Sequence, residues 1–395
     1  MTPAAKPAHV AFCRPDISAG DIDEVVATLK GGWLTTGPRV HEFEQAFAAY
    51  VGARHAVAVN SCTAALHLSL LAGGIGPGDE VITTPLTFCA TANAVLHTGA
   101  TPVFVDVDRD TGNLDPAALA AAITPRTRAL LPVHFAGRPA DMDAIQSLAR
   151  QHGLRVIEDA AHSVEGWVGG RKVGAIGDFT CFSFYATKNL TTGEGGMVTT
   201  ASDEWAGWMR AAALHGLSQD AWARYSPTGR GSYEIVTAGY KYNMMDIQGA
   251  LGVRQLERLP QSLRRRESIW RAYDEAFADL PVVRPAAVPA GVVHARHLYT
   301  LLIDPDVVGV SRDALCEDLR QRGIGTGIHF RALHLFPYYA QRLGLSRGMF
   351  PNAEHISDRT ISLPLSSALS DEDVSRVVGA VRLGLLAPQR GHRAA

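Results

Sequence analysis

The chain has 395 residues, of which 47% are hydrophobic and 19% are charged, and its formal net charge is -2. This length exceeds what one hydrophobic core usually serves, so we expect one large and one smaller domain. The near-neutral charge provides no basic field for nucleic acid, and no run approaches the roughly 18 apolar residues that span a bilayer.

The cysteines and the first residues indicate a reducing compartment. Five cysteines are scattered along the chain without a CxxC pair, at positions Cys13, Cys62, Cys89, Cys181 and Cys316. Three of them lie among apolar or small residues, as buried thiols commonly do. The first ten residues lack the apolar segment of a secretory signal. We therefore expect a cytoplasmic protein that is neither secreted nor inserted in a membrane, and we expect no metal site.

Two helices are predicted before the first strand. Ser18 followed by Asp21 resembles a capping box, and apolar residues then recur at helical spacing until Gly31 and Gly32 end the helix. The loop over residues 31–38 contains Thr35, and a second amphipathic helix follows it. Two interpretations of this loop stay open, because it either lines a ligand site or forms a packed surface turn.

From residue 55 onward, predicted strands alternate with predicted helices. The strand-like segments are HAVAV, EVITT, TPVFVDV, ALLPVHF, LRVIED and FTCFSFY, and helical patterns separate most of them. This βαβ rhythm predicts an α/β fold with a doubly wound, mostly parallel sheet and helices on both faces. Ligands of such sheets bind outside the carboxyl ends of the strands, so the candidate site residues are those that follow each strand.

Two of these strand ends suit the phosphate and the ring of a cofactor. The strand over residues 55–59 leads through Ser61 to Cys62 and Thr63, where a helix begins. A helix N-terminus attracts phosphate through its unpaired N–H groups and its dipole, although an ordinary helix cap is the alternative. Phe88 follows the segment EVITT and either belongs to the core or stacks on a flat ring.

Two further strand ends carry opposite charges. An apolar strand ends on Asp159, with His162 three residues later, and the strand with Ser183 and Tyr185 leads to Lys188 and a glycine-bearing turn. A solvated lysine is the ordinary interpretation of a loop position. Pyridoxal phosphate, however, needs a lysine that forms an imine and an anion opposite its ring nitrogen. Asp159 and Lys188 together therefore indicate a site for this cofactor.

The pattern changes beyond about residue 260. A basic helix, a proline-bearing stretch and a strand over residues 298–303 follow one another. We therefore predict a large domain over residues 1–260 and a smaller α+β domain over residues 261–395. The arginines at positions 264–266 are interpreted as a solvated helix face. A final helix from Ser370 is expected to end near Leu386, and the tail from residue 390 is expected to be disordered.

Three ordered motifs resemble the signatures of the DegT/DnrJ/EryC1/StrS nucleotide-sugar aminotransferases. They are EDAAH over residues 158–162, SFYATKN with GEGG over residues 183–196, and GYKYN with DIQ over residues 239–248. The likeness extends from about residue 12 to about residue 385. It implies the aspartate-aminotransferase fold, which is the type I fold of pyridoxal phosphate enzymes, and transaminase activity with this cofactor.

The resemblance also implies roles for individual residues. Lys188 would hold the cofactor as an imine, and Asp159 would keep its pyridine nitrogen protonated. The other cofactor contacts that it implies are Cys62, Thr63, Phe88, His162, Ser183 and, from the partner subunit of a homodimer with shared active sites, Asn243. Capping of its own helix is the alternative role for Asn243. The residues implied to approach the sugar are Thr35, Tyr185 and His329.

The implied reaction moves an amino group from L-glutamate to a nucleotide-linked 4-keto-6-deoxyhexose, in deoxyaminosugar biosynthesis that supplies antibiotics or polysaccharides. The favoured conversion is dTDP-4-keto-6-deoxyglucose to dTDP-4-amino-4,6-dideoxyglucose, and a 3-keto hexose or a UDP-4-keto sugar is the alternative acceptor. Sugar dehydratases of the same family carry histidine in place of this lysine, so Lys188 argues against a dehydratase. An amino-acid aminotransferase would need arginines for its substrates' carboxylates, for which Arg331 and Arg359 are candidates. A non-catalytic regulator is the least favoured class.

Overall fold

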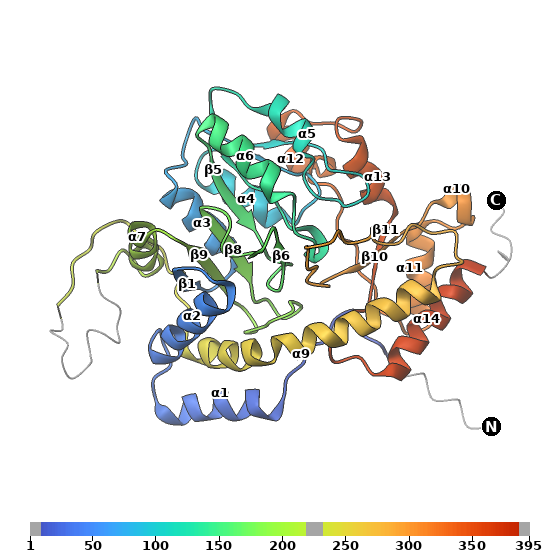
Figure 1. The fold of residues 1–395 in the computed structure, drawn as a ribbon, viewed down its shortest axis with the longest axis horizontal. Helices are drawn as coiled ribbons and strands as arrows, with labels where there is room; N and C mark the ends of the chain where they lie inside the picture. The colour runs from blue at the N-terminus through green and yellow to red at the C-terminus, as the bar shows by residue number, and fades with distance from the viewer. Residues whose placement is uncertain (1–8, 219–231, 387–395) are drawn as a thin grey trace.

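The computed structural model describes residues 9–218 and 232–386 of the chain (Figure 1). A helix-covered sheet forms the larger part of the molecule, and a smaller unit lies at the far end of the long helix α9 (Asp246–Ala276). The tail from residue 390, expected from the sequence to be disordered, lies outside the described residues.

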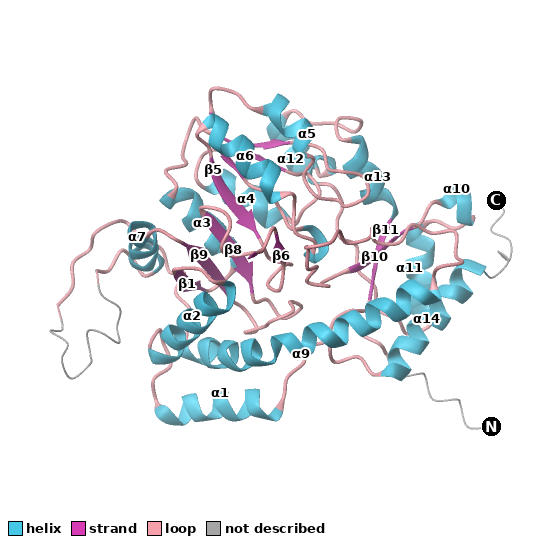
Figure 2. Cartoon of the chain, viewed as in Figure 1, coloured by secondary structure: helices cyan, strands magenta, loops and turns pink. Residues whose placement is uncertain are grey.

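A seven-stranded sheet lies at the centre of the larger part (Figure 2). Its strand order is β1 (His55–Val59), β9 (Gly196–Thr200), β8 (Phe179–Ser183), β5 (Arg155–Asp159), β4 (Thr127–Leu130), β2 (Glu80–Thr83) and β3 (Thr101–Phe104). Strand β9 is antiparallel to both of its neighbours, and the other adjacent pairs are parallel. The predicted mostly parallel sheet is therefore confirmed, and its central strands are apolar because both faces are buried.

Helices cover both faces of this sheet. One face packs against α3 (Cys62–Ala72), α4 (Cys89–His97) and α7 (Asp203–Ala213) in a single apolar core. The other face packs against α2 (Pro38–Val51) and the first half of α9 at one end, and against α5 (Pro116–Leu119) and α6 (Met142–His152) at the other. The doubly wound architecture is thus confirmed, although the helix predicted from Asp115 is short.

Helix α1 (Ala19–Gly31) begins with the predicted capping box between Ser18 and Asp21 and runs beside α9 (Figure 1). Its contacts with α9 are polar, since Asp21 pairs with Arg258 at 3.0 Å and Glu24 pairs with Arg254 at 2.9 Å. Helix α9 itself continues through Pro260 without a break. The domain boundary predicted near residue 260 therefore falls inside a helix, and this division of the chain stays a prediction.

The smaller unit combines helices with a two-stranded sheet of β10 (Tyr299–Leu302) and β11 (Thr360–Leu363). Helices α11 (Arg312–Gln321) and α14 (Asp371–Leu386) and the second half of α9 bury one apolar core with these strands. Three further helices, α10 (Pro305–Val308), α12 (Pro337–Leu343) and α13 (Pro351–Arg359), complete this part. Helices α12 and α13 share an apolar cluster with residues of α4 and β3 in the larger part. A hairpin of β6 (Trp167–Val168) and β7 (Arg171–Lys172) lies beside the main sheet.

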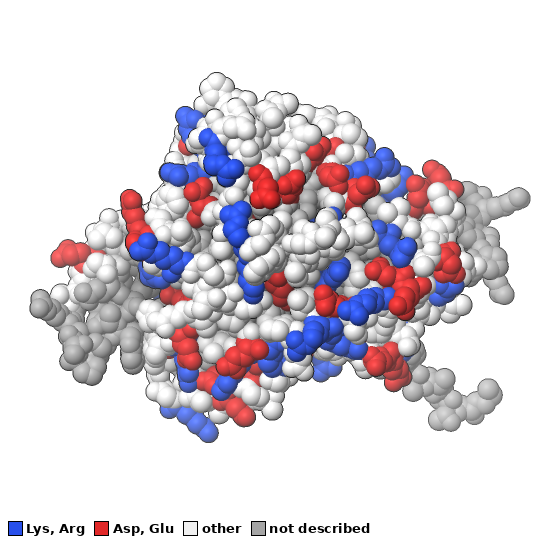
Figure 3. All heavy atoms as spheres, viewed as in Figure 1, with Lys and Arg blue, Asp and Glu red and all other residues white. Residues whose placement is uncertain are grey.

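The surface carries both signs of charge. Figure 3 shows lysines and arginines interspersed with aspartates and glutamates over the visible face, as the near-neutral net charge suggests. The interpretation of residues 264–266 as a solvated face is wrong for Arg266, which is buried because Glu165 pairs with its guanidinium. No helix in the described part of the chain has the length and apolarity needed to cross a membrane.

Candidate active site

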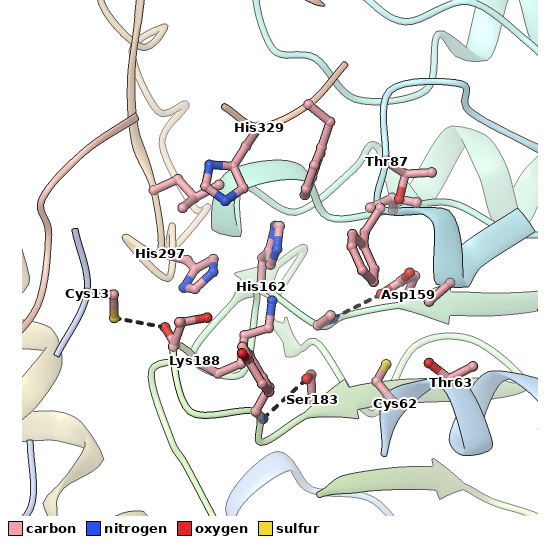
Figure 4. A pocket seen from close by; sticks show the side chains of 18 of the residues that line it. Cys13, Cys62, Thr63, Thr87, Asp159, His162, Ser183, Lys188, His297 and His329 are labelled. Atoms are coloured by element: carbon pink, nitrogen blue, oxygen red, sulfur yellow. Dashed lines mark hydrogen bonds between the residues drawn. The ribbon is translucent and has the colours of Figure 1, made fainter. Parts of the chain in front are cut away.

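A cavity of about 610 Å³ lies at the carboxyl ends of the central strands, with a loop of the smaller unit forming its far wall (Figure 4). The fold brings most of the predicted site residues into its lining. These residues are Cys62, Thr63, Phe88, Asp159, His162, Ser183, Tyr185, Lys188 and His329. Two predicted residues, Thr35 and Asn243, do not belong to the lining.

Lys188 lies in the turn that follows β8, where its backbone N–H donates to the carbonyl of Tyr185 at 2.9 Å. Its side chain reaches into the cavity towards His162 (Figure 4). Burial lowers the pKa of Lys188, and the nearby Cys62 and Asp159 oppose this shift. An amine with a lowered pKa is more often neutral, so this lysine is suited to act as a nucleophile.

Asp159 ends β5 and is buried. Its Oδ2 accepts a hydrogen bond from the Thr91 hydroxyl at 2.8 Å, and its Oδ1 accepts one from the N–H of Ala161 at 3.1 Å. Burial raises the pKa of this carboxyl group, while the two hydrogen bonds and Lys188 act in the opposite direction. A cation placed against the carboxylate would favour its ionised form, so the site fits a protonated ring nitrogen.

The N-terminus of α3 forms another part of the cavity wall. The Ser61 hydroxyl caps the helix by accepting from the N–H of Ala64 at 3.1 Å. The N–H groups of the first helical residues, Cys62 and Thr63, have no partner within the helix and suit a phosphate group. Strand β9 crosses directly behind this turn, and a Cβ on Gly196 would lie 2.5 Å from the carbonyl carbon of Ser61.

These features fit pyridoxal phosphate as a group. Lys188 supplies the amine, Asp159 the buried anion and the α3 N-terminus the phosphate site. In addition, Nδ1 of His162 is buried without a hydrogen-bond partner in the described structure, although such atoms normally have one. The His162 ring stacks on Phe330 at a centroid distance of 5.9 Å. A polar ligand atom beside this ring would satisfy the orphaned nitrogen.

His329 lies in the far wall of the cavity. Its Nδ1 is 2.8 Å from the Ser362 hydroxyl, and its ring stacks on Phe12 at a centroid distance of 5.3 Å. Burial lowers the pKa of His329 to about 4, with a further contribution from Lys188, so the imidazole is neutral at pH 7. Cys13, which follows Phe12 in the chain, also lines the cavity, and its thiol donates to the carbonyl of Thr187 at 3.3 Å.

Sequence reasoning missed several lining residues, including Phe12, Cys13 and His297. The first two precede α1, in a segment that reaches the site because Val10 pairs with Ile324 of the smaller unit. No pattern in the sequence marks that pairing. His297 follows a proline-bearing stretch and precedes β10, and its proximity to a predicted strand is the signal that was available.

Asn243 and Thr35 both lie outside the cavity lining. The Asn243 amide donates to the Thr36 hydroxyl at 2.8 Å, and its Oδ1 accepts from Lys241 at 2.6 Å. Helix α9 has Met245 at its N-cap, so Asn243 does not cap that helix. Thr35 is exposed. The implied role of Asn243 in the partner subunit's site and the implied approach of Thr35 to the sugar stay predictions.

Comparisons with known proteins agree with this geometry. A model described as the DegT/DnrJ/EryC1/StrS aminotransferase family matches residues 15–382. The chain is 53% identical over 372 residues to the spore coat polysaccharide biosynthesis protein SpsC of Bacillus subtilis (strain 168). The aligned region covers 94% of this chain and 96% of that protein.

Solved structures show the same similarity. A putative sugar aminotransferase from Streptococcus pneumoniae, in its PMP form, superposes with a TM-score of 0.89 at 35% identity, over 95% of this chain and 99% of that one. DesI, solved in the presence of its TDP-sugar product, superposes with a TM-score of 0.84 at 35% identity, over 96% of this chain and 93% of that one.

Proposed function

Because the chain belongs to the DegT/DnrJ/EryC1/StrS aminotransferase family, we propose that it moves an amino group from L-glutamate to a nucleotide-linked 4-keto-6-deoxyhexose. The family makes it a pyridoxal phosphate-dependent sugar aminotransferase with the type I fold. The favoured acceptor is dTDP-4-keto-6-deoxyglucose, and the product is then dTDP-4-amino-4,6-dideoxyglucose. The TDP-sugar product of DesI supports this choice of carrier.

The residues in the cavity divide the chemistry among themselves. When bound, pyridoxal phosphate supplies an electron sink for the electrons released as the α C–H bond of the amino donor breaks. Asp159 stabilises the positive charge on the ring nitrogen, and the α3 N-terminus binds the phosphate. Lys188 takes up the proton from the glutamate α-carbon and later returns a proton to the sugar carbon. Glutamate leaves as 2-oxoglutarate, and the sugar ketone becomes an amine.

The observation that carries the proposal is the kind of cavity in which Lys188 and Asp159 meet. Its described lining contains hydroxyl, imidazole and aromatic groups but no arginine. The arginines proposed as carboxylate clamps are engaged elsewhere, since Arg331 donates to the carbonyl of Leu335 and Arg359 pairs with Asp304. A cavity of this composition suits a hydroxyl-bearing sugar, because its hydroxyl and imidazole groups match sugar hydroxyls as hydrogen-bond donors and acceptors.

A second acceptor class is supported by a different relative. SpsC is named for spore coat polysaccharide biosynthesis, which does not restrict the carrier to dTDP or the ketone to position 4. A 3-keto hexose or a UDP-4-keto sugar is therefore the alternative acceptor. We place the enzyme in the cytoplasm, as the free state of all five cysteines supports.

We further propose a two-fold homodimer in which the partner subunit contributes Asn243 to each site. Support comes from apolar side chains that a single chain leaves exposed, because a second copy would cover them. On α1, Ile22 and Leu29 are 56% and 50% exposed, and at the rim of the cavity Phe88 is 60% and Tyr185 is 47% exposed.

The decisive experiment offers the purified holoenzyme and glutamate a panel of keto sugars. The panel contains 4-keto and 3-keto hexoses on dTDP and a 4-keto sugar on UDP, and products are identified by mass and NMR. We expect amination of the dTDP-4-keto-6-deoxyhexose with the highest kcat/KM. Amination of the 3-keto or the UDP sugar with higher kcat/KM would replace the favoured acceptor by the alternative.

A further inference from the structure

A buried hydrogen-bond network connects α9 with the wall of the cavity. Arg266 of α9 pairs with Glu165, whose Oε2 accepts a hydrogen bond from Nδ2 of Asn189 at 2.9 Å. The same Nδ2 donates to the carbonyl of Ala295 at 2.8 Å. At the cavity end, Oδ1 of Asn189 lies 2.9 Å from Nδ1 of His297. Asn189 directly follows Lys188 in the chain, so the network ends beside the candidate catalytic amine.

The partners of Asn189 determine how its amide is oriented. Both hydrogens of an amide nitrogen are used here, one by a carboxylate and the other by a backbone carbonyl, each of which is an acceptor alone. A flipped amide would place its oxygen against these two oxygen acceptors with no hydrogen between them, so both hydrogen bonds from Asn189 would be lost. The Asn189 oxygen must therefore face His297, and since this oxygen cannot donate, Nδ1 of His297 carries the hydrogen.

The protonation state of Nε2 of His297 follows from that of Nδ1. Burial lowers the pKa of His297 well below its ordinary value, and Lys188 adds to this effect, so the imidazole is neutral. A neutral imidazole with its hydrogen on Nδ1 has a lone pair on Nε2. No described residue hydrogen-bonds this nitrogen. The ring lines the cavity and lies 4.4 Å from that of His162, so the lone pair is an acceptor available to a bound molecule.

We propose that Nε2 of His297 accepts a hydrogen bond from a hydroxyl group of the keto-sugar acceptor and so fixes the sugar in the cavity. This inference rests on the proposed sugar function. A lone pair attracts a donor and repels an anion, so this position favours a sugar hydroxyl over a carboxylate of the amino donor. His297 is in this view a specificity-determining residue, and Asn189, Glu165 and Arg266 are positioning residues that fix its tautomer.

The tautomer is tested first, in the holoenzyme without substrate. NMR of protein with ¹⁵N-labelled histidine distinguishes a protonated from an unprotonated ring nitrogen, and the resonance that disappears in His297→Gln identifies the residue. We expect hydrogen on Nδ1 and none on Nε2 at pH 7. Hydrogen on Nε2 would overturn the proposal, whatever the activity of the enzyme.

Substrate recognition is tested with the two half-reactions measured separately. The glutamate half-reaction is followed by the absorbance change of the cofactor, and the sugar half-reaction by product formation. His297→Phe should raise the half-saturating concentration of keto sugar roughly tenfold, the usual effect of losing one hydrogen bond, and should leave the glutamate half-reaction nearly unchanged. His297→Gln, which retains a carbonyl acceptor, should recover part of the loss. Equal damage to both half-reactions would place His297 at Lys188 instead and contradict the proposal.

Deoxy analogues of the sugar identify the hydroxyl. A nucleotide-linked 4-keto-6-deoxyhexose has free hydroxyls at positions 2 and 3. For one of the two monodeoxy analogues, the kcat/KM of the wild-type enzyme should be roughly tenfold lower than for the parent sugar. His297→Phe should show no further loss with that analogue. Equal losses in variant and wild type for both analogues would overturn the proposal. If the wild-type enzyme aminates none of the keto sugars, the proposed function fails rather than this assignment, because the tautomer is measured independently.

Discussion

Asp159 is buried and Lys188 is partly buried, and desolvation shifts their pKa values in opposite directions, each towards the neutral form. The two residues are then expected to act in different protonation states. A neutral amine can attack a carbonyl carbon, whereas a carboxyl group that becomes ionised beside a cationic ring stabilises that ring. The pair therefore fits a cofactor that brings both an aldehyde and a protonated nitrogen, and two variants test the two roles separately.

Replacement of Lys188 should abolish turnover and the covalent link to the cofactor. The wild-type protein is expected to be yellow, and borohydride should fix the cofactor irreversibly on the peptide that contains Lys188. Lys188→Ala should still bind the cofactor through the α3 N-terminus and Asp159 but should not catalyse the reaction. Peptide mapping by mass spectrometry after reduction gives the answer. A labelled peptide with a different lysine would contradict the assignment.

Asp159→Asn should keep the fold but lose the anion that faces the ring nitrogen. The loss of several kcal/mol of charge stabilisation corresponds to a decrease in kcat of hundreds-fold or more. Thr91→Val is the matched control, because it removes the hydroxyl that donates to Oδ2 of Asp159 and leaves the carboxylate in place. Its decrease should be much smaller. Unchanged turnover in Asp159→Asn would exclude the proposed role.

The lowered pKa of His329, a partly buried histidine, makes the stability of the protein sensitive to acid. The pKa of His329 is about 4 in the folded protein against 6.5 ordinarily, so between these pH values the unfolded chain binds more protons. Stability should therefore fall as the pH drops from about 6.5 to about 4, by on the order of 2 kcal/mol for a shift of this size in a partly solvated group. Urea denaturation gives the free energy of unfolding at pH 7 and at pH 5. The difference between these two values should be smaller for His329→Gln than for the wild type. Identical differences would refute this origin.

At the scale of elements, the strands and their ends could be predicted because their causes are local. Apolar runs followed by glycine and small polar residues mark each strand and the turn that leaves it, so Asp159 and Lys188 could be placed at strand ends. The burial of Arg266 could not be predicted in this way. It depends on Glu165, which lies 101 residues away in the chain. A run of arginines on a helix gives no sign of such a partner.

The fit between β9 and the start of α3 leads to a prediction about Gly196. A Cβ there would lie 2.5 Å from the Ser61 carbonyl and 2.7 Å from the Cys62 nitrogen, both backbone atoms that cannot move independently. Gly196→Ala should displace the phosphate site and weaken cofactor binding at least about tenfold, with a loss of about 1–3 kcal/mol in stability. Gly207→Ala is the matched control, since a Cβ on this residue of α7 would meet no atom within 4 Å. Equilibrium titration with pyridoxal phosphate compares the two, and equal affinities would contradict the prediction.

At the scale of the whole molecule, the site is completed by segments that are distant in sequence. The pairing of Val10 with Ile324 brings Phe12 and Cys13 to the cavity, and a hydrogen bond to Asn189 holds His297 there. Neither contact follows from periodicity or turn chemistry, so these lining residues could not be predicted. The third motif is a different case, because Asn243 pairs with the end of β1 without reaching the cavity of its own chain.

Complementation between two inactive chains tests whether Asn243 acts across a dimer. Lys188→Ala lacks the catalytic amine, and Asn243→Ala would lack a phosphate contact in the partner's site, so each homodimer should have little activity. If sites are shared, a mixed dimer combines the intact lysine of one chain with the intact asparagine of the other in one of its two sites. Activity should then return, to at most about half of the wild-type value per mixed dimer.

Subunit exchange must be shown independently for that result to be interpreted. Two chains with different affinity tags, co-expressed and purified through both tags, give the mixed dimer directly. The matched control pairs Lys188→Ala with Asp159→Asn, two residues that line one cavity of the same chain, and this mixture should gain no activity. Because Asn243 bonds to Thr36 within its own chain, a purely structural role would weaken every site that contains the variant subunit. Failure of the purified mixed dimer to recover activity would therefore show that Asn243 serves its own subunit.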